Sequence, residues 1–385
     1  MKIFLSFLQS KHQHPIPAYS FWEYYLKNGL TEGAHEWVEC EDVDWAKGLV
    51  PQSEEELSKW KSTSWEKTLH KIKLTKPAIF LSYLYPQQID EQAILEIKKL
   101  GVYCVNFFCD HVREFSAVPS IFGIFDLNWV PEYAAIAMYK KAGFDYIYLP
   151  MPMWVAPSHR NITTTETGQL SFIGSYDVQR LLLLEELAQT NFPFEVYGAG
   201  WLSDEEKPVN QPLYYPVAQK LRFQYRFLTR YGLNAYIRKL QQRNFKPSSG
   251  NNLKSHLNGK INFENYVRIT QDSMITLGIN RYPSFNFPLR HPNTYSRLRD
   301  IEAPMLGACY LTEFTAGLEE LYDIGKDILV YKNTSELIEK ANWLKEDVNT
   351  RFQLRKNAQQ VALNEHSIPN AIAKIIQRQN NTIIP

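Results

Sequence analysis

The sequence predicts an α/β protein made of two domains, each built on a parallel β-sheet that is covered by helices. Three observations support this fold class. The chain has 385 residues, which exceeds the usual size of one domain. Short apolar runs alternate with helical patterns along most of its length. The apolar runs, such as 78–81, are continuous, as expected for strands that are buried on both faces.

The first series of elements spans residues 1–150. The N-terminal run 1–8 is too short for the apolar region of a signal peptide and predicts a first buried strand instead. Periodicity predicts strands near 2–8, 78–84, 102–108, 125–130 and 146–149, and helices near 18–27, 88–99 and 132–142.

A linker separates this series from a second one. Pro150, Pro152 and Pro157 lie close together and precede a polar stretch, which is typical of a connection between domains. The second series begins at Leu170. It predicts strands near 170–174, 194–197, 274–280, 308–312 and 327–331, followed by helices at 334–346, 348–364 and 368–379.

Residues 207–263 interrupt the alternation. This basic segment contains eleven Lys and Arg residues and no Asp or Glu. Arg222, Arg226 and Arg230 are spaced to share one helical face. The segment is expected to face an anionic acceptor or a membrane surface, because its cations cannot neutralise each other. The alternative is that they pair with acids elsewhere, such as 204–206 or the carboxylates of 313–323.

Composition excludes several classes of protein. A net charge of +1 argues against global steering of nucleic acid, and no apolar run reaches the length of a membrane span. The four cysteines show no metal spacing, which favours buried thiols and a cytoplasmic location. The chain lacks the glycine-rich loops of ATPases and dinucleotide oxidoreductases. The Asp42-Val-Asp44 triplet has the form of a metal-binding motif but lies in a polar, Trp-containing surface stretch, and we interpret it as chance.

The stretch 299–313 carries the strongest functional pattern. It reads Arg-Asp-Ile-Glu-Ala-Pro-Met-Leu-Gly-Ala-Cys-Tyr-Leu-Thr-Glu, which predicts a helix, a glycine turn and a short strand. Backbone N–H groups and the dipole at a helix N-terminus favour a phosphate. A carboxylate one turn away suits ribose hydroxyls. The stretch therefore predicts a nucleotide site.

This pattern, R-x-[FI]-E-A-x-x-x-G-[AC]-x-x-L-T-E, resembles the donor-nucleotide segment of glycosyltransferases with the GT-B fold. The resemblance is to the CgeB-like, spore-maturation-type group. Most of the chain is similar to that family in the family's order, through 76–83, 101–110, 125–130, 143–150, 171–175 with Arg180, and 196–201.

The resemblance implies a GT-B architecture, in which two Rossmann-like domains face a cleft and C-terminal helices cross back. The implied domains are an acceptor domain at 1–157, a nucleotide-sugar domain at 165–350 that contains the basic segment, and helices at 351–385 that brace the first domain.

The same resemblance assigns the donor contacts within 299–313. Glu302 is expected to bind the ribose of the donor, and Arg299 a diphosphate oxygen. The alternatives are that Glu302 only stabilises its own helix and that Arg299 pairs with Glu302 or Glu313. Thr312 is expected to touch the donor, whereas Gly307 shapes the backbone.

Two further groups of residues are expected near the donor. Gly174 and Ser175 end the first strand of the second domain, where a glycine lets the backbone approach a phosphate. Arg281 follows another strand of that domain and is a candidate diphosphate clamp, since ligands bind at the carboxyl ends of parallel strands. His291 and Asn293 are candidates for the sugar pocket.

The first domain is expected to supply a general base. Asp110 and His111 follow the strand near 102–108, and either could take the proton of an acceptor hydroxyl; Asp110 could instead only cap the next turn. His14, in the loop after the first strand, is expected in the acceptor pocket. Many retaining GT-B enzymes carry a glutamate eight positions before Glu302, but here that position is Thr294, which leaves the stereochemical outcome open.

These observations predict a glycosyltransferase that moves a sugar from a UDP- or GDP-linked donor to a hydroxyl of a glycan, lipid-linked or protein acceptor. The family implies that it needs no metal and no other cofactor. The alternatives are a protein that binds nucleic acid or an anionic surface through 207–263, and a GT-B epimerase of sugar nucleotides. Nucleic acid is not the favoured partner. The expected location is cytoplasmic, with a peripheral position at the inner face of a membrane if 207–263 binds lipid.

Overall fold

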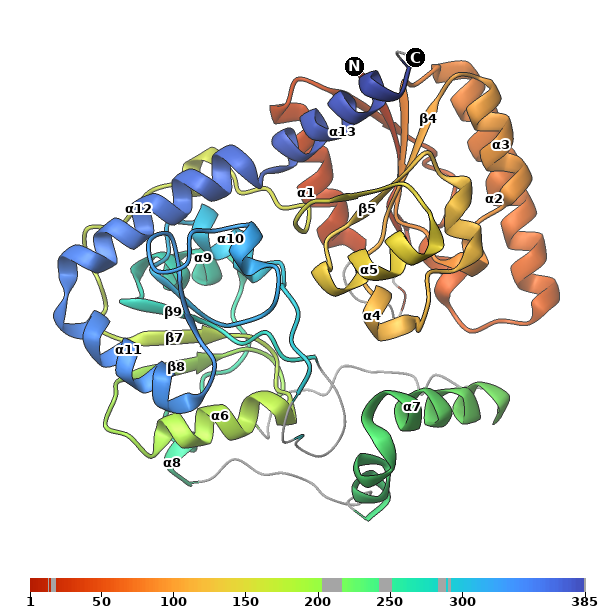
Figure 1. Cartoon of the computed structure of the whole chain (residues 1–385). Helices are drawn as coiled ribbons and strands as arrows, with labels where there is room; N and C mark the ends of the chain where they lie inside the picture. Colours follow the sequence, from red (N-terminus) through yellow and green to blue (C-terminus); the bar gives the residue numbers. More distant parts are fainter. Residues whose placement is uncertain are drawn as a thin grey trace. The chain divides into compact units, whose positions relative to one another are not determined.

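The computed structural model describes residues 1–12, 14, 19–202, 217–241, 251–282, 289 and 292–383. The chain divides into two compact units, one formed by Met1–Val155 with Ala362–Pro385 and the other by Ala156–Val361. Each unit contains a parallel sheet with helices packed on it (Figure 1). The predicted alternation of strands and helices is therefore confirmed in both halves of the sequence.

The sheet of the first unit has the strand order β2-β1-β3-β4-β5-β6, and all neighbouring strands are parallel. Its inner strands are almost completely buried, as their continuous apolar sequences predict. The strands are β1 (Lys2–Ser6), β2 (Glu36–Glu39), β3 (Ile79–Ser82), β4 (Tyr103–Phe107), β5 (Leu127–Val130) and β6 (Tyr146–Tyr148).

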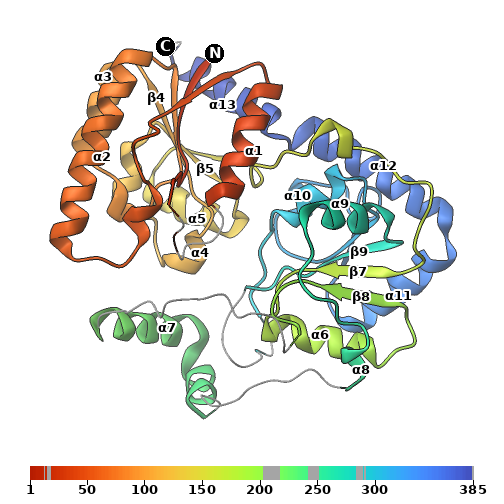
Figure 2. The same ribbon diagram turned by 180° about the vertical axis from the view of Figure 1, so that it is seen from behind.

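Helices cover both faces of this sheet. Figures 1 and 2 show α1 and α13 on one face, and α2 and α3 on the other. The last helix of the chain therefore packs beside the first helix. The helices of this unit are α1 (Tyr19–Glu32), α2 (Glu54–Thr75), α3 (Glu91–Lys99), α4 (His111–Glu114), α5 (Tyr133–Ala142) and α13 (Ile368–Ile383).

The segment between β1 and β3 differs from the sequence prediction. Sequence reasoning missed β2 and α2 and assigned the stretch around Asp44 to the surface. In the structure Trp45 is fully buried, with its ring centroid 5.9 Å from that of Trp60 and 5.3 Å from that of Trp65 on α2. The largely polar α2 sequence hides this contact, because only two of its aromatic side chains, Trp60 and Trp65, pack on Trp45.

The sheet of the second unit has the order β11-β10-β9-β7-β8 and is also parallel throughout. All five strands lie where periodicity predicts them. They are β7 (Leu170–Ile173), β8 (Phe194–Tyr197), β9 (Ile275–Gly278), β10 (Tyr310–Glu313) and β11 (Leu329–Tyr331).

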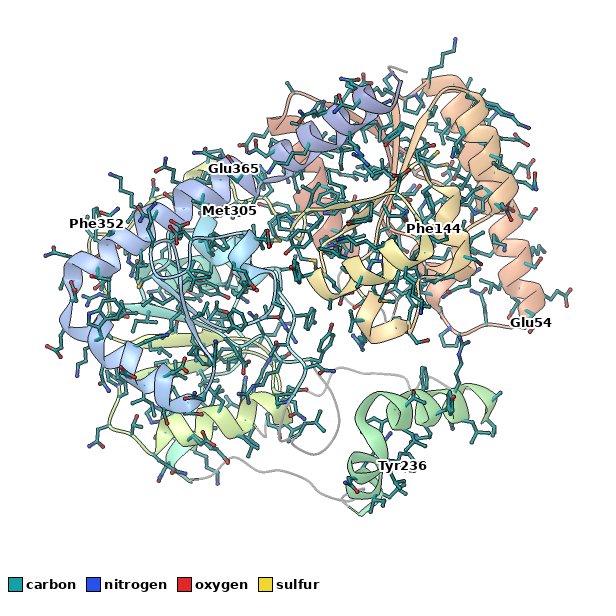
Figure 3. All side chains as sticks on the ribbon, viewed as in Figure 1. Glu54, Phe144, Tyr236, Met305, Phe352 and Glu365 are labelled. Atoms are coloured by element: carbon teal, nitrogen blue, oxygen red, sulfur yellow. The ribbon has the colours of Figure 1, made fainter. Side chains whose placement is uncertain are left out.

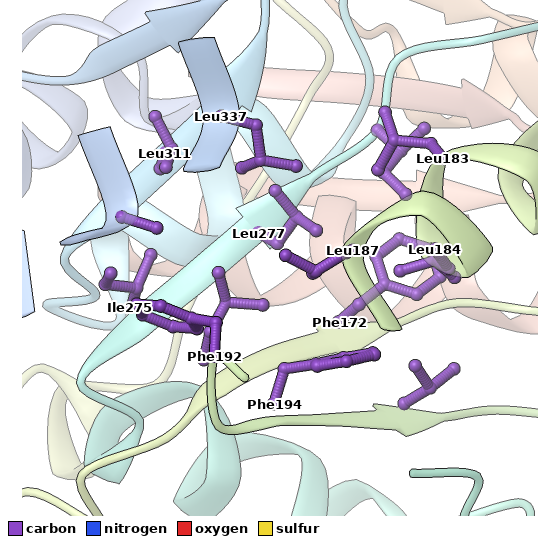
Figure 4. Close-up of a cluster of buried hydrophobic side chains, with 14 of the residues drawn as sticks. Phe172, Leu183, Leu184, Leu187, Phe192, Phe194, Ile275, Leu277, Leu311 and Leu337 are labelled. Atoms are coloured by element: carbon purple, nitrogen blue, oxygen red, sulfur yellow. The ribbon is translucent and has the colours of Figure 1, made fainter. Parts of the chain in front are cut away.

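A hydrophobic core fills the space between this sheet and two of its helices, α6 and α11. Figure 4 shows Leu183, Leu184 and Leu187 of α6 together with Leu337 of α11 over strand residues such as Leu277. The helices of the second unit are α6 (Val178–Ala188), α7 (Val217–Gln241), α8 (Asn251–Lys254), α9 (Phe263–Asp272), α10 (Arg299–Met305), α11 (Thr334–Glu346) and α12 (Val348–Glu365).

A buried ion cluster joins the start of the second unit to α12. Glu166 accepts hydrogen bonds from Arg351 Nε at 2.9 Å and from Arg355 Nη2 at 3.0 Å. Arg355, which is only 1% exposed, also donates to the carbonyl oxygens of Gly307 and Gln271. The cluster thus ties the segment before β7 to α12 and to the turn after α10.

Replacing Glu166 by glutamine is expected to lower the free energy of unfolding by about 3 kcal/mol, because it leaves two buried guanidinium groups without their counter-charge. Urea denaturation of the whole chain measures this. Glu339→Gln, at an exposed position on α11, is the matched control and is expected to change little. Equal stabilities of the two variants would contradict the role given to the cluster.

Candidate functional site

The carboxyl ends of the parallel strands in the second unit bring several predicted residues together. Arg281, just after β9, donates through Nε to Glu313 Oε1 at the end of β10, 2.8 Å away. Its Nη1 donates to the carbonyl oxygen of Gln179 on α6 at 2.7 Å. Arg281 therefore joins two strand ends and the first turn of a helix, with its charge balanced by Glu313.

A buried polar network lies behind these strand ends. The carboxylate oxygen Oδ1 of Asp300 accepts hydrogen bonds from Tyr310 at 2.8 Å, Thr312 at 3.1 Å and Asn280 at 3.2 Å. Burial raises the pKa of Asp300. A Cβ at Gly278 would lie 2.2 Å from Thr312 Oγ1, so only glycine fits there. The Thr312 hydroxyl is fully buried and engaged inside the fold rather than directed at a ligand.

Three cationic side chains gather beside the network. Arg180 lies in the first turn of α6, while Arg297 and Arg299 lie at the start of α10; we call these three the arginine cluster. Burial, followed by the positive charge of Arg297, lowers the pKa of Arg180 to about 10, and the charge of Arg299 acts in the same direction. Arg180 is only 8% exposed. An anion bound here would relieve the repulsion between these like charges.

Aromatic side chains support two members of the cluster. The guanidinium of Arg299 lies 4.4 Å from the ring centroid of Tyr266, and that of Arg297 lies 4.6 Å from the ring centroid of Tyr295. The Tyr266 hydroxyl also donates to Glu302 Oε2 at 2.6 Å. Tyr266 therefore holds a cation and a carboxylate in fixed positions next to each other.

The loop after β7 completes this edge. Arg180 Nη1 donates to the carbonyl oxygen of Ser175 at 2.6 Å. A Cβ at Gly174 would lie 2.8 Å from the ring of Phe172 and 3.1 Å from Arg180 Nη1. The backbone at Gly174 and Ser175 can approach the arginine cluster closely only because residue 174 has no side chain.

The structure therefore brings Gly174, Ser175, Arg281, Arg299 and Glu302 to one edge of the second sheet, as the sequence predicts for strand ends. Asn293 is exposed near that edge, and its carbonyl oxygen accepts from the backbone N–H of Tyr282. His291 lies outside the described residues.

Sequence reasoning missed two members of this site. Arg297 was not considered, although the Arg-Leu-Arg spacing of 297–299 directs two cations to one helix start. Tyr266 was overlooked because nothing in the sequence of α9 distinguishes it from an ordinary core aromatic residue. Its contacts with Arg299 and Glu302 are visible only in the folded chain.

In the first unit, Asp110 follows β4 at the carboxyl edge of the sheet. The hydroxyls of Tyr85 and Tyr83, from the loop after β3, donate to Asp110 Oδ2 at 2.9 Å and 3.2 Å. Asp110 is half-buried. Two phenols therefore fix the orientation of a carboxylate that remains partly accessible.

His111 differs from the expectation that it could act on a substrate. Its side chain is fully buried, with Nε2 2.7 Å from the hydroxyl of Tyr139 and Nδ1 3.4 Å from Glu132 Oε2. An imidazole enclosed in this way cannot reach an acceptor in this structure. Tyr139 on α5 and Glu132 just before α5 enclose the imidazole ring, so His111 is not placed to act as the general base that the sequence suggested.

His14 is held by an acid that sequence reasoning dismissed. His14 Nε2–H donates to Asp44 Oδ2 at 2.8 Å, and Asp44 Oδ1 accepts from the backbone N–H of Lys47 at 3.0 Å. Asp44 thus orients a histidine. Among the residues that the structure describes, no group of three or more His, Cys, Asp or Glu side chains is placed to hold a metal ion.

Comparisons with known proteins identify the family and the fold. A family model described as glycosyl transferase-like matches residues 179–377, which is more than half of the chain. No curated protein sequence matches significantly.

Solved structures match over nearly the whole chain. The sucrose-phosphate synthase of Thermosynechococcus elongatus has 11% identity and a TM-score of 0.58, with 99% of each chain covered. A glycosyltransferase from Rickettsia africae has 9% identity and a TM-score of 0.59, with 100% of this chain and 98% of that chain covered. Anabaena HepE in complex with UDP-glucose has 11% identity and a TM-score of 0.54, with 98% of this chain and 100% of that chain covered. At such low identities these likenesses establish the fold alone.

Proposed function

This chain belongs to the glycosyl transferase-like family and is a glycosyltransferase of the GT-B type; we propose that it transfers a sugar from a UDP-linked donor to a hydroxyl group of its acceptor. The observation that carries the proposal is the arginine cluster, in which the charges of Arg297 and Arg299 act on the buried Arg180 and lower its pKa. A diphosphate supplies the negative charge that such a cluster requires.

The donor contacts follow from the chemistry of this edge. Arg180, Arg297 and Arg299 hold the diphosphate, with the backbone at Gly174 and Ser175 close to it. Glu302, oriented by Tyr266, accepts hydrogen bonds from the ribose hydroxyls. We favour uridine as the base because HepE, which has the same fold, was solved with UDP-glucose.

The same cations promote the chemical step. When the bond between the sugar and the diphosphate breaks, negative charge grows on the leaving phosphate oxygen. Preformed positive charges that are already desolvated stabilise this charge without reorganisation. The arginine cluster therefore serves both binding and catalysis, and Arg281, paired with Glu313, positions the strand end beside it.

We assign the acceptor side to the first unit. Asp110 accepts the proton of the acceptor hydroxyl, and Tyr83 and Tyr85 orient its carboxylate. His14, which Asp44 orients, contacts the acceptor. Asn293, in the second unit, contacts the transferred sugar. A glycan, a lipid-linked sugar or a protein hydroxyl satisfies this chemistry.

A thermal-shift screen tests the proposed donor. UDP-glucose at about 100 times its Kd is expected to add about 2.7 kcal/mol to the stability of the whole chain. UDP and UDP-galactose serve as comparisons, and GDP-mannose as the mismatched base. Equal shifts with UDP- and GDP-sugars would contradict the choice of uridine, and no shift with any of them would contradict the donor site itself.

Replacing Glu302 by glutamine is expected to weaken UDP binding about tenfold, since a neutral amide is a poorer acceptor for two ribose hydroxyls. Calorimetry with UDP measures this effect. Tyr266→Phe is the informative companion, because it removes only the hydroxyl that orients Glu302 and is expected to weaken binding less. Unchanged affinity for UDP in Glu302→Gln, together with an unaltered fold, would remove Glu302 from the ribose site.

A further inference from the structure

The helix α7 folds back on itself at a glycine. Gly232 interrupts the helical backbone with φ 81° and ψ 169°. Across this kink, Lys239 Nζ lies 4.3 Å from the ring centroid of Phe227 and donates to Gln224 Oε1 at 2.9 Å. The rings of Phe227 and Tyr236 also contact, with centroids 6.3 Å apart. The two halves of α7 thus form a small helical hairpin, on which Figure 3 labels Tyr236.

This hairpin exposes apolar side chains at helical spacing. In the first half, Val217, Leu221 and Tyr225 recur every four residues, and Leu221 is 65% exposed. In the second half, Leu233, which is 62% exposed, and Ile237 follow the same spacing. Leu240 extends this second row. In a helix of a soluble protein such a row packs on a core. Here these side chains are exposed, while Phe227, between the two halves of α7, is buried.

The charge of the same region is one-sided. Residues 207–263 contain eleven cations and no acid, and the side chain of Arg222 on α7 is exposed. A surface that combines exposed aliphatic residues with an excess of basic over acidic residues is complementary to the interface of an anionic bilayer. Among the described residues, no helix is long and apolar enough to cross a membrane.

The aliphatic rows distinguish a lipid surface from nucleic acid. Single-stranded nucleic acid needs aromatic faces on which bases can stack. Tyr225 and Phe223 are exposed aromatic side chains of the hairpin, but they are outnumbered by exposed aliphatic ones. The aliphatic side chains offer no such face and partition readily into the boundary of the acyl chains; they are Val217, Leu221, Leu233, Ile237 and Leu240.

We propose that the α7 hairpin docks this enzyme on an anionic phospholipid bilayer, with its aliphatic rows in the interface and exposed basic side chains of α7, such as Lys220 and Arg222, at the headgroups. This docking is independent of the donor site, because α7 contributes none of the residues assigned to UDP. It brings the enzyme to a surface on which a lipid-linked acceptor is concentrated.

Vesicle co-sedimentation of the full chain tests the proposal. Vesicles of phosphatidylcholine with phosphatidylglycerol are compared with pure phosphatidylcholine, at low and at physiological salt. The wild type is expected to bind only the anionic vesicles, and less at higher salt. Because each basic residue near an anionic surface contributes about fivefold to binding, Arg222→Gln, Arg226→Gln and Arg230→Gln together are expected to weaken it on the order of 100-fold.

A second variant tests the aliphatic rows. Leu221→Gln with Ile237→Gln is expected to weaken vesicle binding about tenfold while leaving net charge unchanged. Leu74→Gln, at an equally exposed leucine on α2, is the apolar control. Lys59→Gln, Lys71→Gln and Lys99→Gln together remove the same charge from exposed positions on α2 and α3 and serve as the charge control.

The outcomes separate this proposal from the proposed function. UDP affinity is expected to remain at the wild-type value in both α7 variants, so a loss of vesicle binding alone supports docking. Failure of the wild type to bind anionic vesicles would overturn the proposal, as would equal losses in the α7 variants and their controls. Binding of single-stranded DNA in preference to vesicles would overturn it in favour of nucleic acid.

Discussion

Replacing Arg180 by methionine is expected to weaken UDP binding on the order of 100-fold. Arg180 is buried and lies next to Arg297 and Arg299, and a charge-assisted hydrogen bond to a diphosphate in such surroundings contributes about 1.5–3 kcal/mol. The lowered pKa of Arg180, about 10, means that its charge opposes folding at any pH below that value when no anion is bound. Removing the charge relieves this cost, which offsets the lost hydrogen bond to Ser175.

Two measurements check this result. Calorimetry with UDP should show the loss of affinity, while the unfolding temperature of the ligand-free variant stays close to that of the wild type. Arg268→Met, at an exposed arginine on α9, is the matched control and should leave the affinity unchanged. Arg180→Lys keeps the positive charge but lacks the planar guanidinium group, and it should recover part of the UDP affinity that Arg180→Met loses. Wild-type affinity for UDP in Arg180→Met would place the diphosphate elsewhere.

Replacing Asp110 by asparagine is expected to lower kcat by about 10²- to 10⁴-fold, the usual contribution of a positioned general base. Asparagine has the same shape but cannot take a proton, and its side chain can still accept from Tyr83 and Tyr85. UDP affinity should remain unchanged because donor binding does not involve this residue. Release of UDP in the presence of an acceptor measures turnover, and calorimetry measures donor affinity.

Substitutions of residues near Asp110 serve as controls for this prediction. Glu114→Gln, on the short helix after Asp110, is the control and should leave turnover unchanged. Tyr85→Phe removes one of the two phenols that orient the carboxylate and should lower kcat only severalfold. His14→Ala should raise the KM for the acceptor. A large loss of kcat in His14→Ala with normal turnover in Asp110→Asn would instead assign the base to His14, oriented by Asp44.

Most of the fold was predictable from local sequence patterns. The strands near 78–84, 170–174 and 274–280 were predictable because a continuous apolar run bounded by polar turns has few ways to be buried other than inside a parallel sheet. The stretch 299–313 was likewise readable, since its helix, glycine turn and strand are specified by neighbouring residues. The family relationship followed from the same local signal.

Local patterns did not reveal which side chains share one environment, because this depends on how the elements pack. His111 and Asp110 are adjacent in sequence, yet His111 is enclosed by Tyr139 and Glu132 while Asp110 remains partly accessible. Arg180 meets Arg297 and Arg299 although a long stretch of chain separates them. Local periodicity specifies an element and the face it buries, whereas strand order and crossover connections determine which distant charges are desolvated together.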